Sequence, residues 1–159
     1  MSVAIIDTSI FCELLGIPGK SNDPASFRAE LKAKVETNEI LLLPMTTIIE
    51  AGNHIGQCSA SGATRRYYAE QFAASVQKAV DGEAPFSPTP FFDPPELRKW
   101  LAEFPNWTTP TDPRGRGSGL GDLTIQKEWD RQCELNPSRR VYIWSLDGRL
   151  AAYDRAPAL

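Results

Sequence analysis

Three short apolar runs dominate the hydrophobic pattern of the chain, and they predict β-strands that are buried on both faces. The runs cover residues 2–7, 40–43 and 141–144. The first run ends at Asp7, Pro44 stops the second, and the third leads through a Ser-Leu step to Asp147. Two of the three predicted strands therefore deliver a carboxylate at or just beyond their carboxyl ends.

Between these runs the apolar period changes to that of a helix. Phe27, Leu31 and Val35 recur every fourth residue, after an N-cap at Asp23 with Pro24 at the first helical position. Two more stripes predict helices over 61–81, with Tyr68, Phe72, Val76 and Val80, and over 120–134, with Ile125, Trp129 and Cys133. Strands separated by helices predict an α/β fold of three layers, with a parallel sheet flanked by helices.

Residues 82–118 interrupt this alternation, because eight of the thirteen prolines fall there. One short helix is predicted at 95–103. The segment has too few apolar positions for a core of its own. We therefore expect a structured excursion on the edge of the sheet, within one domain that spans 1–159.

Composition narrows the class of protein. A chain of 159 residues with 42% apolar content can bury the core of one domain. Its net charge of −3 opposes nucleic-acid binding, unless some of the acids are metal ligands. Three scattered cysteines without a CxxC pair suggest neither a disulfide framework nor a zinc site. No apolar stretch approaches the roughly 20 residues that span a bilayer, so a soluble, cytoplasmic protein is expected.

Four acids stand where ligands usually bind in open parallel sheets, which is outside the carboxyl ends of the strands. Asp7 and Asp147 follow strands, whereas Glu50 and Asp122 lie at the beginnings of helices. Four converging carboxylates would raise one another's pKa, and a bound cation would relieve that repulsion. Hard oxygen ligands favour Mg²⁺ or Mn²⁺ over zinc.

Each acid also has an ordinary structural interpretation. Asp7 followed by Thr8 can cap a helix, and Asp122 in a first helical turn suits the helix dipole. Glu50 alone fits a solvated helical position, and Asp147 before a glycine fits a turn. The functional interpretation therefore depends on all four acids meeting.

The ordered set of motifs resembles the PIN-domain family. The similar segments are Ile5-Ile6-Asp7-Thr8-Ser9, then Thr46-Thr47-Ile48-Ile49-Glu50, then Gly119-Leu120-Gly121-Asp122, and last Ser145-Leu146-Asp147. The resemblance covers nearly the whole chain. It implies a parallel sheet flanked by helices and a Mg²⁺- or Mn²⁺-dependent ribonuclease, often the toxin of a toxin–antitoxin pair. It also implies a protein antitoxin and a homodimer as partners.

Two departures from the family bear on these expectations. The insert at 82–118 makes the chain longer than compact toxin-type members. About a dozen residues follow Asp147, which leaves little room for another edge strand, so a smaller sheet is expected.

The expected catalytic site uses Asp7, Glu50 and Asp122 to bind one ion, with Asp147 completing that site or holding a second ion. The side chains expected to orient these carboxylates or their waters are Thr8, Ser9, Ser145 and Asn53. The side chains expected to contact RNA, or DNA, are Arg114, Arg116, Arg65, Arg66 and His54. A solvated loop, an amphipathic helix and a scaffold histidine remain the alternatives for these last residues.

Other functions fit less well. A haloacid-dehalogenase-like phosphoryl-transfer enzyme would carry a second Asp at position 9, which is Ser. The glycines at 115, 117, 119 and 121 do not form GxGxxG, and Gly19-Lys20 lacks the earlier glycine of a P-loop. A non-catalytic binding module on the same fold remains the alternative from a different class.

Overall fold

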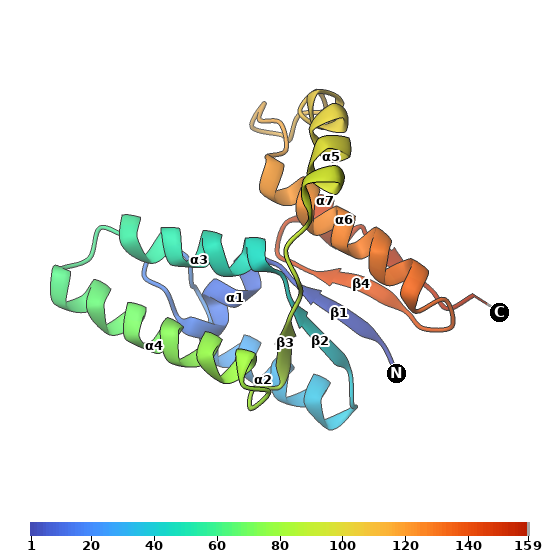
Figure 1. Ribbon diagram of the computed structural model, residues 1–159. Coiled ribbons are helices and arrows are strands. Elements are labelled where there is room, and N and C mark those ends of the chain that lie inside the picture. Colours follow the sequence, from blue (N-terminus) through green and yellow to red (C-terminus); the bar gives the residue numbers. More distant parts are fainter. Residues whose placement is uncertain (159) are drawn as a thin grey trace.

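A computed structural model describes residues 1–158, which form a five-stranded sheet with helices on both faces (Figure 1). The sheet order is β3-β2-β1-β4-β5. The strands are β1 Val3–Ile6, β2 Ile40–Leu43, β3 Phe86–Pro88, β4 Val141–Trp144 and β5 Asp154–Arg155. All pairs are parallel except β4 with β5, which is antiparallel. The predicted α/β class and the three predicted strands are confirmed.

Strands β1 and β4 are buried on both faces, as their uninterrupted apolar runs predict. In β1, Ala4 and Ile6 belong to one apolar cluster, whereas Val3 and Ile5 belong to another on the opposite face. The sheet therefore separates two cores, each covered by helices.

The described residues form seven helices. Their bounds are α1 Thr8–Leu15, α2 Pro24–Glu36, α3 Met45–Gln57, α4 Gly62–Val80, α5 Pro94–Trp107, α6 Leu120–Leu135 and α7 Gly148–Ala151. Asp23 caps α2 as predicted, with its side chain accepting from the Ser26 amide. The predicted stripes of α2 and α4 pack on the cluster that contains Ala4 and Ile6. Val35 and Val80 are the exceptions, and both are exposed because they lie in the last turns of their helices.

The stripe of α6 packs on the other cluster, where Ile125 is buried and Trp129 and Cys133 are partly buried. The indole of Trp129 donates a hydrogen bond of 3.0 Å to the carbonyl of Val141, which fixes α6 against β4. The start of this helix is thereby held at a defined place along the edge of the sheet.

The proline-rich insert adds a strand and a long helix to the domain. Residues of β3 pair with β2, so the excursion extends the edge of the sheet. Helix α5, Pro94–Trp107, begins one residue before the predicted 95–103 and ends four residues after it. A capping box formed by Asp93 and Glu96 fixes its start. Figure 1 shows α5 standing beyond the end of the sheet, beside α6 and α7.

The expectation of a smaller sheet is wrong. Strand β5 follows α7 and pairs with β4. The guanidinium of Arg140 donates hydrogen bonds of 2.9 and 2.7 Å to the carboxylate of Asp154. A two-residue strand carries no periodicity, so the sequence pattern could not reveal it. The antiparallel pairing likewise departs from the expected all-parallel sheet. Within residues 1–158, none of the helices is long and apolar enough to cross a bilayer.

Candidate functional site

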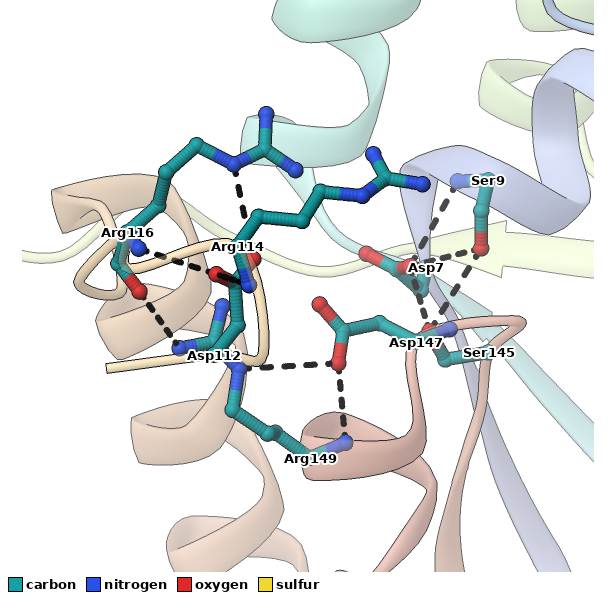
Figure 2. Close-up of polar contacts among 8 residues, drawn as sticks. All are labelled: Asp7, Ser9, Asp112, Arg114, Arg116, Ser145, Asp147 and Arg149. Atoms are coloured by element: carbon teal, nitrogen blue, oxygen red, sulfur yellow. Dashed lines mark hydrogen bonds and ion pairs between the residues drawn. The ribbon is translucent and has the colours of Figure 1, made fainter. Parts of the chain in front are cut away.

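Asp7 is fixed where β1 and β4 end side by side. It caps α1, and its buried carboxylate accepts hydrogen bonds at Oδ2 from the hydroxyls of Ser9 (2.8 Å) and Ser145 (2.7 Å) (Figure 2). These two serines were expected to orient a carboxylate. No hydrogen bond from residues 1–158 reaches Oδ1 of Asp7. One oxygen of Asp7 is therefore positioned by the fold, and the other is free to bind.

Glu50 reaches the same place from helix α3. The buried hydroxyl of Thr47 donates a 2.8 Å hydrogen bond to the carbonyl of Ile6, which anchors α3 at the end of β1. Glu50 lies nearly one turn later on the helix, and Thr8 donates a 2.6 Å hydrogen bond to its Oε2. Thr8, also expected as a supporting residue, thus links the first helix to the second acid.

Asp122 lies in the first turn of α6, next to a close helix–helix contact. The hydroxyls of Thr46 and Thr124 lie 2.7 Å apart across this contact. A Cβ at Gly121 would overlap Oε1 of Glu50 and would lie 3.4 Å from Cγ2 of Thr46. The absence of a side chain at 121 therefore lets Asp122 approach Glu50.

Asp147 begins the short helix α7. Its amide donates to Ser145 Oγ at 3.0 Å, and its Oδ1 accepts from the amide of Arg149 at 2.8 Å. Because Ser145 also binds Asp7, one hydroxyl connects two acids from different strands.

The four predicted acids line one pocket of about 250 Å³. The other residues that line it are Thr8, Ser9, Cys12, Lys20, His54 and Leu150. Burial, together with the charges of Asp7, Asp147 and Glu50, raises the pKa of Asp122 to about 6. The four carboxylates therefore interact electrostatically across the pocket.

Within residues 1–158, no three His, Cys, Asp or Glu side chains are gathered tightly enough to hold a metal ion as they stand. In this arrangement one oxygen of Glu50 is hydrogen-bonded to Thr8, and one oxygen of Asp147 is hydrogen-bonded to the Arg149 amide. The pocket contains the oxygen donors that a hard cation prefers, but they are not drawn together.

Two basic residues also line the pocket. Buried Glu13 accepts hydrogen bonds from Ser21 Oγ and from the amides of residues 22 and 23, which orders the loop that carries Lys20. His54 lies one turn after Glu50; burial and Lys20 lower its pKa, although Glu50 opposes them, so its imidazole is neutral at pH 7. His54 was predicted from the sequence as a site residue, whereas Lys20 was not, because it belongs to no recognisable motif.

The loop of residues 112–119, which contains three glycines, places arginines beside this pocket. Asp112 Oδ1 accepts from the amides of Arg114 and Arg116, both at 2.9 Å, which closes a tight turn. The turn, Leu146, Asp147 and Arg149 line a neighbouring pocket, and Arg114 extends toward Asp7 in Figure 2. Arg149 was missed, although it follows Asp147 by only two residues.

Three expected residues, Arg65, Arg66 and Asn53, line neither this pocket nor the neighbouring one. Arg65 donates to the carbonyls of Cys58 and Ala60, and Arg66 pairs with Glu70 at 2.9 Å. Asn53 is exposed on α3. The reason for the first two is geometric, because α3 carries the chain away from the sheet before α4 begins (Figure 1).

The crowding at Gly121 predicts different effects of alanine at two helical glycines. Gly121→Ala should leave the free energy of unfolding unchanged or slightly lower, because the methyl group must displace the Glu50 carboxylate, and losing the hydrogen bond from Thr8, about 1 kcal/mol, offsets the gain in helix propensity. Gly56→Ala on α3, with open space around its Cβ position, should raise it by about 0.5–1 kcal/mol. Urea unfolding measures both, and stabilisation by both substitutions would contradict the close approach at 121.

The raised pKa of Asp122 predicts a pH-dependent effect of Asp122→Asn in EDTA. The Asp122 carboxyl group holds its proton more tightly in the folded state than in the unfolded state. Above about pH 6 the charge on Asp122 therefore lowers the stability of the folded state. The variant should be more stable than the wild type at pH 7.5, by about 1 kcal/mol, with the difference vanishing near pH 4. Asp154→Asn should instead be less stable than the wild type at pH 7.5, because the hydrogen bond from Arg140 lowers the pKa of Asp154 and stabilises its charged form. Thermal unfolding at several pH values tests both.

The candidate site brings together four carboxylates, two hydroxyl groups, an amine and an imidazole around one cavity. Comparison of the chain with protein-family models, with curated proteins and with solved structures found no match in any of the three. The chemistry of these side chains is therefore what indicates a function.

Proposed function

We propose that the protein is a metal-dependent nuclease of the PIN-like type that hydrolyses phosphodiester bonds in RNA. The observation that carries the proposal is the convergence of Asp7, Glu50, Asp122 and Asp147, from four distant segments, on one pocket. Like charges are brought together in a fold only where something favourable offsets their repulsion. A divalent cation supplies that offset.

The donor set fits Mg²⁺ or Mn²⁺. Every acidic group in the pocket offers hard oxygen atoms, and its single imidazole and its buried thiol are a poor set for zinc. Asp7, Glu50 and Asp122 would hold the ion, with Asp147 as a fourth ligand or the ligand of a second ion. When bound, such an ion stabilises negative charge on phosphodiester oxygens and lowers the pKa of a bound water molecule.

The residues of the chain have separable roles in this proposal. Ser9 and Ser145 hold one oxygen of Asp7 in place, which leaves the other to face the ion. Thr8 does the same for Glu50. His54, being neutral, can accept a proton from a water molecule or a hydroxyl group of the substrate.

The arginines beside the pocket supply local positive charge that the negative net charge of the chain does not reveal. Arg114, Arg116 and Arg149 border Asp147, and Lys20 lines the acidic pocket itself. These cations can bind the phosphates on either side of the reacting one. A protein antitoxin and a second copy of the chain stay predictions of the resemblance.

Cleavage of labelled single-stranded RNA tests the proposal. The wild type should cut in Mg²⁺ or Mn²⁺ and not in EDTA, and Asp7→Asn should lower kcat/KM by roughly 100-fold or more, because several kcal/mol of transition-state stabilisation is lost. On helix α6, Asp122→Asn should be impaired, whereas Asp130→Asn, outside the pocket, should not. Equal cleavage by the wild type and Asp7→Asn, or none by either, would contradict the proposal. DNA of the same sequence, assayed in parallel, distinguishes the two substrates.

Ion binding can be measured without cleavage. Mn²⁺ in excess over its dissociation constant should raise Tm of the wild type, because it binds the folded state alone, and EDTA should reverse the change. At 100 times the dissociation constant the stabilisation is about 2.7 kcal/mol. Asp122→Asn should abolish most of the Mn²⁺-induced change, whereas Asp130→Asn should keep it. An equal rise in Tm for all three proteins would place the ion elsewhere.

A further inference from the structure

A second cavity, of about 460 Å³, opens beside the acidic pocket. Its apolar wall comes from Trp107 at the end of α5, Leu123 of α6, and Leu150 and Tyr153 around α7. The polar groups of the lining come from Glu103, Asn106, Ser118, Asp122 and Arg149. The volume and the mostly apolar lining with a few polar groups are those of a small-molecule site.

This cavity is continuous with the proposed reaction site. Asp122 and Leu150 line both the cavity and the acidic pocket, and Arg149 lines both the cavity and the arginine-bordered pocket. An occupant of the cavity is therefore next to a carboxylate of the site on one side and a guanidinium on the other. A nucleotide has the matching form, with a flat apolar base linked to an anionic phosphate.

The aromatic groups of the cavity suit a base. Trp107 and Tyr153 have ring centroids 6.5 Å apart with planes inclined at 32°, and Trp129 supports Tyr153 edge-on at 5.2 Å. The indole N–H of Trp107 is buried and has no hydrogen-bond partner among residues 1–158. Such a donor is costly to leave unpaired. Because the N–H lies in the plane of the ring, a base stacked on the indole face cannot accept it, and the acceptor would be a sugar or phosphate oxygen of the same nucleotide.

We propose that this cavity binds the nucleobase adjacent to the cleaved phosphate, stacked on Trp107 or Tyr153. The inference rests on the proposed nuclease function and adds a base-binding subsite to it. It also gives the proline-rich insert a role, because α5 supplies Asn106 and Trp107, and the loop after it supplies Pro110 and Ser118. The arginines favour a nucleotide over an aromatic peptide side chain, since a peptide brings no phosphate to Arg149 and Arg114.

Binding of nucleoside 5′-monophosphates, measured calorimetrically in EDTA, tests the subsite without any cleavage. At least one of the four common ribonucleotides should bind saturably, and ribose 5-phosphate, which lacks the base, should bind at least tenfold more weakly. Trp107→Ala should weaken the nucleotide at least tenfold. Trp107→Phe, which keeps a stacking face and guards against a folding defect but lacks the N–H, should recover part of the affinity.

Trp100→Ala is the matched control. Trp100 lies on the same helix but lines a different cavity with Phe92, so its loss should leave nucleotide binding unchanged. Equal binding by the wild type and Trp107→Ala overturns the proposal, and so does the absence of nucleotide binding. Binding of N-acetyltryptophanamide without nucleotide binding overturns it in favour of a peptide anchor. Since the titrations contain no divalent ion, a failure of metal-dependent cleavage remains a separate result.

Discussion

Repulsion among four carboxylates is the constraint around which this end of the molecule is built. Asp7, Glu50, Asp122 and Asp147 line one pocket, and their mutual charge, added to burial, raises the pKa of Asp122. The fold offsets part of this repulsion locally. Hydroxyl groups donate to Asp7 and Glu50, and a backbone amide donates to Asp147. Each of these hydrogen bonds gives a partner to a carboxylate oxygen that the pocket partly withdraws from water.

Local capping and convergence on a site are therefore compatible uses of the same side chains. Asp7 caps α1 and Asp122 lies in the first turn of α6, where the positive end of the helix dipole stabilises an anion. The structural interpretations of Asp7 and Asp122 are correct as far as they go. They are incomplete, because the parallel pairing of β1 with β4 sets Asp7 beside Ser145, two residues before Asp147. Helix starts and strand ends fall at one edge of a parallel sheet, so caps at that edge become neighbours.

The parts of the fold that sequence predicted are those with a repeating pattern. β1, β2 and β4 are uninterrupted apolar runs, and α2, α4 and α6 carry stripes that face the sheet. Helix α1 follows its strand after one residue and is buried nearly all round, so its period was hidden. Strand β3 lies among prolines, and β5 has two residues. Neither contains enough positions for a pattern, and pairing with an existing strand, not propensity, decides their structure.

The candidate site divides in the same way. Asp7, Asp122, Asp147 and the hydroxyl partners could be predicted, because each lies at or near the end of a patterned element. Glu50, seven residues after β2, was predicted from the motif Thr46-Thr47-Ile48-Ile49-Glu50. Lys20 could not, because its loop is ordered by the buried carboxylate of Glu13, a contact between residues without a motif. Arg65 and Arg66 suggested a nucleic-acid surface from composition alone. Their place depends on how far α3 extends from the sheet, and a local pattern does not contain that length.

The insert shows how a segment without a core of its own can still define a cavity. Its strand joins the edge of the sheet through β2, which fixes where the following helix begins. Asp93 and Glu96 cap α5, and the loop behind it is pressed onto the helix end, since a Cβ at Gly117 would overlap the carbonyl oxygen of Thr108. Trp107, at the last residue of α5, is thereby held opposite Tyr153 with its N–H unpaired. An unpaired buried donor is retained at the expense of stability, so its presence in a residue that lines the cavity is better explained by an occupant than by packing alone.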